Sequence, residues 1–141
     1  MPRITNPHSA AEKAARAIDR DRERERRFML QNCYKHADDL ATKLVQRLMD
    51  KRIIETTSES DLRTAFTTLL TKMSDMEEFD MQFKIAPLRT LVQNPSFVSL
   101  YITQYIVEDL IEHPKVNDVF GDDLEIYQAV ESVMKQVRPP E

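Results

Sequence analysis

Glycine is almost missing from this chain: Gly121 is the single one among 141 residues, whereas a globular protein averages about 7%. Tight two-residue β-turns depend on glycine because they need positive φ angles. A sandwich or barrel built from many hairpins is therefore excluded as the main architecture. Helices joined by Pro, Asn, Ser and Thr fit this composition better.

Cysteine is equally scarce, and Cys33 stands alone. One thiol can form neither an internal disulfide nor a multi-cysteine zinc site, and such a chain suits a reducing compartment. The N-terminus lacks the apolar core of a secretory signal. The longest apolar stretch, 97–111, is short and interrupted by five polar residues, so it cannot span a bilayer. We expect a cytoplasmic protein without membrane contact.

Motifs of enzyme sites are lacking as well. Phosphate-binding and nucleophile-elbow motifs need more than one glycine, and no segment has the ligand spacing of an EF-hand. His36 and Asp39 lie one helical turn apart, with Cys33 nearby, and such a group could orient an imidazole. A lone Cys and His on a helix beside the core are more often packing or surface residues. We predict no catalytic residue, no metal site and no cofactor.

Helix formers run without Gly or Pro from Ser9 to about Arg52. An apolar stripe starts at Ala11, Ala14, Ala15 and Ile18, stops at Arg22 and Glu25, and resumes from Leu30. Its second half is an amphipathic core helix. Its first half has little to bury and should project from the core. We therefore divide the chain into a charged arm, 1–27, and a helical domain, 28–138.

The middle of the chain is partly ambiguous. Residues 53–57 form either a loop on the core or a brief extended segment, and Ser58 to Asp61 has the pattern of a helix cap. Residues 79–85 alternate as in a strand, yet their apolar residues also fit helical spacing. Only 52–56 could pair with them, and an isolated ribbon is marginal. We favour helix or irregular structure for 79–85.

The last third contains the most apolar helix. Asn94 and Pro95 suit an N-cap and first turn, and 96–112 is apolar around most of its circumference, as expected for the central helix. Residues 114–120 suggest a short helical turn that Gly121 ends with a left-handed residue. Asp122 to Glu125 then caps a final helix. Together these segments predict an all-α fold: a single helical-bundle-like domain of five or six helices with a long, partly projecting N-terminal helix.

The most distinctive segment is an arginine run interleaved with acids. Residues 1–27 carry eight basic and five acidic side chains, a net charge of +3, whereas the rest carries 12 basic and 19 acidic, a net charge of −7. The run is either a solvated helix with internal ion pairs or a contact arm for an acidic protein face or nucleic acid. The candidate binding residues are its arginines: Arg16, Arg20, Arg22, Arg24, Arg26 and Arg27.

Two functions follow from this pattern. The first is a non-catalytic helical protein-interaction module (an adaptor, assembly subunit or regulator) that works through helix faces and the N-terminal helix. Its partner would be another protein or a second copy of the chain. The alternative is a nucleic-acid-associated accessory subunit that uses the arginine arm. The interleaved acids and the lack of an aromatic side chain in the run favour the first.

Overall fold

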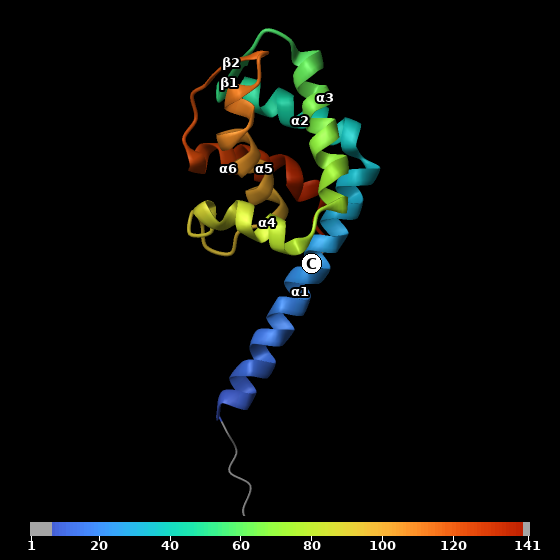
Figure 1. Cartoon of the computed structure of the whole chain (residues 1–141), viewed down its shortest axis with the longest axis vertical. Coiled ribbons are helices and arrows are strands. Elements are labelled where there is room, and N and C mark those ends of the chain that lie inside the picture. Colours follow the sequence, from blue (N-terminus) through green and yellow to red (C-terminus); the bar gives the residue numbers. More distant parts are fainter. Residues whose placement is uncertain (1–6, 140–141) are drawn as a thin grey trace, which may run out of the picture.

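The structure, a computed structural model, describes the backbone of residues 7–139 and the side chains of residue 13 and of 20–139. Six α-helices and one two-stranded ribbon make up this part of the chain, which confirms the predicted all-α fold (Figure 1). The elements are α1 (Pro7–Lys35), α2 (Ala37–Asp50), β1 (Ile54–Thr56), α3 (Glu59–Lys72), η1 (Met73–Asp75), α4 (Glu78–Ile85), η2 (Ala86–Leu88), α5 (Phe97–Glu108), η3 (Leu110–Glu112), β2 (Val116–Val119), α6 (Asp123–Met134) and η4 (Lys135–Val137).

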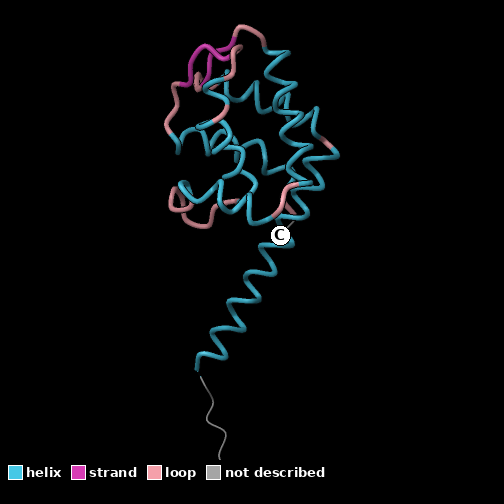
Figure 2. The backbone as a smooth tube through the Cα atoms, in the orientation of Figure 1, coloured by secondary structure: helices cyan, strands magenta, loops and turns pink. Residues whose placement is uncertain are grey.

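The long N-terminal helix projects from the body, as its broken apolar stripe predicts. The N-terminal half of α1 extends away from all other elements, and its C-terminal part packs against α3 and α5 (Figures 1 and 2). Met29, Leu30 and Cys33 are the first residues of α1 to be buried in the described part of the helix. Full burial therefore begins where large apolar side chains appear in the helix.

The stretch of helix formers from Ser9 to about Arg52 forms two helices, α1 and α2. His36 interrupts it with φ −114° and ψ 28°, although its N–H still bonds the Asn32 carbonyl at 2.9 Å. Neither Gly nor Pro lies at this break, so we attribute it to the packing of the surrounding helices. The bend turns α2 so that Leu40 and Leu44 reach the core together with the buried end of α1. A bend caused by packing against other helices cannot be predicted from the residues of the helix alone.

α5 is the central helix, as its composition predicts. Its apolar residues Val98, Ile102 and Ile106 are fully buried, and so are Ser99 and Thr103. α4 packs on one side of it and α6 on another. A helix buried around most of its circumference fixes the positions of its neighbours, and here it supplies the floor on which α1 and α4 meet.

The ribbon settles one open alternative and corrects one prediction. β1 confirms the extended interpretation of 53–57, but its antiparallel partner is β2, not 79–85. Residues 116–119 are therefore a strand rather than a helical turn. Thr57 N–H donates to the Lys115 carbonyl at 2.9 Å, and a bulge follows Glu55. The pairing joins segments about sixty residues apart, at the end of the body opposite to the projecting part of α1 (Figure 2).

The predictions for 79–85, Asn94 and Gly121 are partly confirmed and partly wrong. Residues 79–85 lie in helix α4, which confirms the favoured helical interpretation. Asn94 is not the N-cap of α5: it takes a left-handed φ of 55°, and Ser96 caps the helix. Gly121 has no positive φ, so the predicted left-handed stop is wrong. A Cβ there would meet Ile53 Cγ2 at 2.8 Å, so this glycine is required by close approach.

Two predicted caps are confirmed. The Ser58 side chain accepts a hydrogen bond from Asp61 N–H at the start of α3. Asp122 and Glu125 form a reciprocal capping box at the start of α6. Among the described helices, none combines the length and the apolar character that crossing a membrane would require.

Candidate functional site

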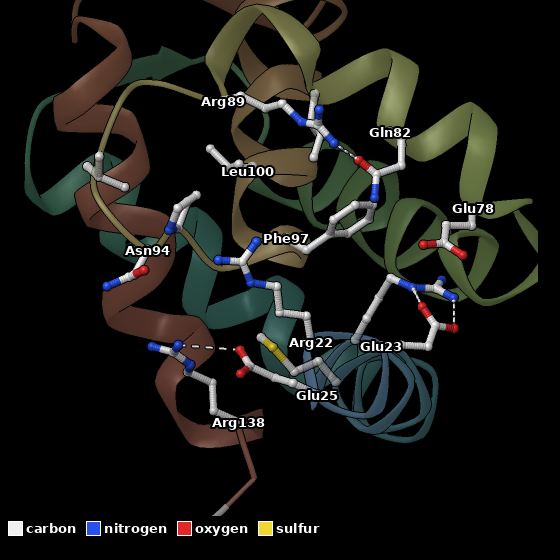
Figure 3. A pocket seen from close by; sticks show the side chains of 15 residues that line it. Arg22, Glu23, Glu25, Glu78, Gln82, Arg89, Asn94, Phe97, Leu100 and Arg138 are labelled. Carbon is white, nitrogen blue, oxygen red and sulfur yellow. Dashed lines mark hydrogen bonds and ion pairs between the residues drawn. The ribbon is translucent and has the colours of Figure 1, made fainter. Parts of the chain in front are cut away.

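A hollow of about 820 Å³ lies where α1 leaves the body, and we call it the junction groove. Its volume falls in the usual range for binding sites. Figure 3 shows side chains converging on it from α1, α4, the 89–97 segment and the C-terminal end. Its lining consists of Arg22, Glu23, Glu25, Arg26, Met29, Glu78, Gln82, Ile85, Arg89, Val92, Asn94, Pro95, Phe97, Leu100 and Arg138.

One wall of the groove is a clamp that holds α1 on the body. Arg138 donates to Glu131 at 2.7 Å and to Glu25 of α1 at 3.3 Å. Ser99 of α5 donates its hydroxyl to the same Glu131. Burial alone would lower the pKa of Arg138, but the charges of Glu131 and Glu25 outweigh it and raise the pKa. The Arg138 charge is therefore satisfied, and the clamp is structural.

On a second wall of the groove, formed by α1, the charged side chains also pair with one another. Arg26 donates to Glu23 at 2.9 Å, and Arg27 donates to the same carboxylate at 3.0 Å. The hydrogen bond from Arg26 is the main reason why the pKa of Glu23 lies below its usual value. The Arg26 guanidinium also lies 5.9 Å from the centre of the Phe97 ring, within the range of a cation–π contact.

Arg22 and Arg89 differ from these paired arginines. Within the described part of the chain, neither makes an ion pair with a carboxylate. Arg22 points into the hollow, and Arg89 donates only to the neutral amide oxygen of Gln82 (Figure 3). Glu78 also lacks an ion pair among the described residues, but it lies at the far edge of the hollow from Arg22.

The floor between these two guanidinium groups is apolar. Met29, Ile85 and Leu100 are buried there, and Val92 and Phe97 are partly exposed. Guanidinium groups pair with carboxylates or phosphates in a planar, two-point geometry. The groove can therefore hold a negatively charged group at Arg22 and Arg89 while an attached apolar group covers the floor.

The predicted arginine run does not form one surface. Arg22 and Arg26 lie in the groove, whereas Arg27 is exposed and paired with Glu23. Arg20 and Arg24 are exposed and lie outside the groove, and the side chain of Arg16 lies outside the described residues. Sequence reasoning missed every groove residue from the rest of the chain, among them Gln82, Arg89, Phe97 and Arg138.

The same contacts locate the projecting part of α1. Glu25 bonds Arg138 and Arg26 approaches Phe97, so both residues belong to the packed part of the helix. The part of α1 that extends from the body ends before Arg22. A deletion intended to remove only the arm should therefore stop at residue 21, not at residue 26 or 27.

The other chemically interesting residues lie elsewhere. Cys33 is fully buried, and this burial raises the pKa of its thiol to about 12, which leaves almost no thiolate at neutral pH. His36 is exposed at the bend between α1 and α2. In the part of the chain that the structure describes, no three His, Cys, Asp or Glu side chains gather as metal ligands would.

Comparisons of the chain with family models, curated proteins and solved structures found no match.

Proposed function

We propose that this chain is a non-catalytic helical protein-interaction module, an adaptor, assembly subunit or regulator, that binds an acidic segment of a partner in the junction groove. The observation that carries the proposal is the pair Arg22 and Arg89. Two guanidinium groups without a carboxylate partner among the described residues face one hollow with an apolar floor. An acidic peptide with apolar side chains supplies both kinds of contact.

The lining supports binding rather than catalysis. The groove residues include no Ser, Thr, Cys, His, Lys or Tyr, so the usual nucleophiles are missing from it. Two of its three carboxylates, Glu23 and Glu25, are engaged in ion pairs. A catalytic site needs a nucleophile, a base and a stabilising group together, and beside its arginines this lining offers Glu78 as the one carboxylate without an ion pair among the described residues.

The experiment measures fluorescence anisotropy with two labelled twelve-residue peptides. The first alternates Asp or Glu with Leu or Phe, and the second carries Lys in place of each acid. We expect saturable binding of the acidic peptide only. Arg22→Ala with Arg89→Ala should weaken it about tenfold or more, because each charge-assisted hydrogen bond contributes about 1.5–3 kcal/mol.

The matched control is Arg47→Ala, because Arg47 is exposed on α2 and does not line the groove. This variant should bind the acidic peptide as the unmodified protein does. Equal binding by the Arg22→Ala, Arg89→Ala double variant would refute the groove as the binding site. Circular dichroism melts of all variants show whether each remains folded.

The alternative is a nucleic-acid-associated accessory subunit. It is favoured by the net charge of +3 over residues 1–27 and opposed by the acids interleaved with the arginines and by the lack of an aromatic side chain within the run. The same anisotropy assay with a labelled twenty-nucleotide oligothymidine distinguishes the two. Binding to DNA tighter than to the acidic peptide, with log K falling by about 0.7 per contacted phosphate for each unit of log salt, would support the alternative.

A further inference from the structure

α4 turns an aromatic side toward solvent, away from the body. Phe79 and Phe83 lie one turn apart on this helix, and each is 76% exposed. The next exposed apolar residues are Ala86 and Pro87 in η2, which follows α4 directly. One exposed apolar side chain is ordinary on a protein surface, whereas neighbouring large ones indicate a contact surface. We call these four residues, Phe79, Phe83, Ala86 and Pro87, the α4 face.

The α4 face is held in place from behind. Met81 and Ile85, on the opposite side of α4, are buried in the core. Lys84 joins α4 to the end of α5, because its ammonium group lies 2.7 Å from a carboxylate oxygen of Glu108 and 3.3 Å from one of Asp109. The two rings therefore stand on a helix whose position is set before a partner arrives, which reduces the entropy that binding must overcome.

Acidic side chains lie on both sides of the two rings. Successive residues of a helix are about 100° apart, which puts Asp80 on one side of the line of phenylalanines and Glu78 on the other. Two more acids, Asp75 and Glu77, come just before α4. In the part of the chain that the structure describes, none of these four carboxylates makes an ion pair.

Nearby positive charges do not offset these acids. Residues 75–89 contain four acids and two bases, Lys84 and Arg89. Lys84 is paired with Glu108 and Asp109, and Arg89 lines the junction groove. The charge beside the rings is therefore negative, and a partner that covers them must bring positive charge together with apolar groups.

The charges around the α4 face distinguish between possible occupants. An anionic membrane and a nucleic acid carry the same sign as Asp80 and Glu78, so both would be repelled. A second copy that docks its own α4 face about a two-fold axis would likewise place acid against acid. A helix with Lys or Arg on both sides of an apolar stripe matches the rings and the charges together.

We propose that the α4 face binds a basic amphipathic helix of a partner protein. Phe79 and Phe83 form a ridge of residues four apart, which packs into the groove between side chains of a facing helix. Basic residues beside the partner's apolar stripe then meet Asp80 and Glu78. α4 has eight residues and is about 12 Å long, so the contact is small and its dissociation constant should be on the order of micromolar. This surface is not the junction groove, and its partner has the opposite charge.

The first experiment measures fluorescence anisotropy with two labelled sixteen-residue peptides. One places Leu at helical spacing with Lys on both sides of the stripe, and the other has the same composition in an order that gives no stripe. We expect saturable binding of the striped peptide only. A peptide that alternates Lys with Leu or Phe, as in the groove assay, also has no stripe when helical and should not bind.

Phe79→Ser with Phe83→Ser should weaken binding of the striped peptide about tenfold or more, because a few buried aromatic anchors carry most of the binding energy of an interface. The matched control is Phe120→Ser: Phe120 is 61% exposed after β2, and its removal should leave binding unchanged. Glu78→Gln with Asp80→Asn should weaken binding several-fold and reduce its dependence on salt. Circular dichroism melts show which variants remain folded.

Equal binding of the striped and unstriped peptides, or unchanged binding by the folded Phe79→Ser, Phe83→Ser variant, would overturn the proposal. Two further measurements detect other occupants: co-sedimentation with vesicles that contain one third phosphatidylserine, and size-exclusion chromatography with light scattering. Vesicle binding that is lost in the same variant would assign the face to a membrane. A dimer that this variant reduces to the monomer mass of 16.5 kDa would assign it to a second copy, and either result would overturn the proposal.

Discussion

The one glycine of the chain gives the sharpest test of the fold. Gly121 precedes α6, and its backbone has no positive φ, so alanine fits the turn conformation itself. The obstacle is space: a Cβ at this position would lie 2.8 Å from Ile53 Cγ2 and 3.3 Å from Ile53 Cγ1. Gly121→Ala should therefore destabilise the protein through one identifiable contact.

The size of this loss in stability depends on how firmly the side chain of Ile53 is held in place. Its side chain is buried and β-branched, and its carbonyl accepts hydrogen bonds from Phe120 N–H at 2.7 Å and Gly121 N–H at 3.4 Å. It can neither change rotamer freely nor move away. Overpacking at such a site costs about 1–3 kcal/mol, and the reduced entropy of the unfolded chain returns about 0.4–1 kcal/mol. We expect a net loss of about 1–2 kcal/mol.

A double-mutant cycle isolates the contact. The free energy of unfolding is measured by urea denaturation for Gly121→Ala in three backgrounds: unmodified, Ile53→Val and Ile53→Ala. Valine keeps both Cγ atoms, so the loss should persist there. Alanine removes both, so the loss should vanish or become a small gain. The coupling energy between Gly121→Ala and Ile53→Ala should be about 1–3 kcal/mol.

An equal cost of Gly121→Ala in the Ile53→Ala and unmodified backgrounds would refute the reasoning. It would mean that the turn, not the contact with Ile53, requires glycine. The Ile53→Ala background is itself expected to cost about 2–5 kcal/mol because Ile53 is buried, and a domain of this size has about 5–15 kcal/mol of stability.

Three further predictions rest on burial and charge. Ile106→Ala in α5 and Leu110→Ala in η3 each remove a fully buried side chain and should cost about 2–5 kcal/mol in urea denaturation; losses below about 1 kcal/mol at both sites would contradict the central position of α5 and of the turn that follows it. Cys33, with its pKa raised to about 12 by burial, should react slowly with a thiol reagent at pH 8 until urea unfolds the chain, and fast labelling of the folded protein would contradict its burial. Since Arg26 lowers the pKa of Glu23, the stability that Glu23 contributes is present above the ordinary pKa of 4.5 and is lost as the pH falls through the lowered value; Glu23→Gln should therefore destabilise the protein at pH 7 more than at pH 3.

The sequence predicts best those features that neighbouring residues determine. Ser58 and Asp122 form caps as their patterns indicate, because a cap involves residues only three apart. α5 is central because almost every position in 96–106 is apolar or small. Each of these predictions needs one segment alone, and the rest of the fold does not alter it.

The wrong predictions concern features that residues far apart in the chain determine together. β1 and β2 contain three and four residues, too few to show a strand period, and their pairing depends on partners such as Glu55 and Asp118 far apart in the chain. The bend at His36 and the close approach of Gly121 to Ile53 are likewise set by tertiary contacts. A single sequence contains no signal for contacts of this range.

The arginine run illustrates how the same limit applies to function. A run of charges along a helix points in all directions, so only residues about one turn apart can share a site. Arg22 and Arg26 meet this condition and enter the groove, while Arg24 does not. Arg22 differs from Arg26 because no carboxylate of the described residues forms an ion pair with it. It differs from Arg24 because it lines the groove together with Arg89. Because Arg89 lies 67 positions further along the chain, the composition of the run could predict a charged helix, but only the fold shows which of its arginines share the groove with Arg89.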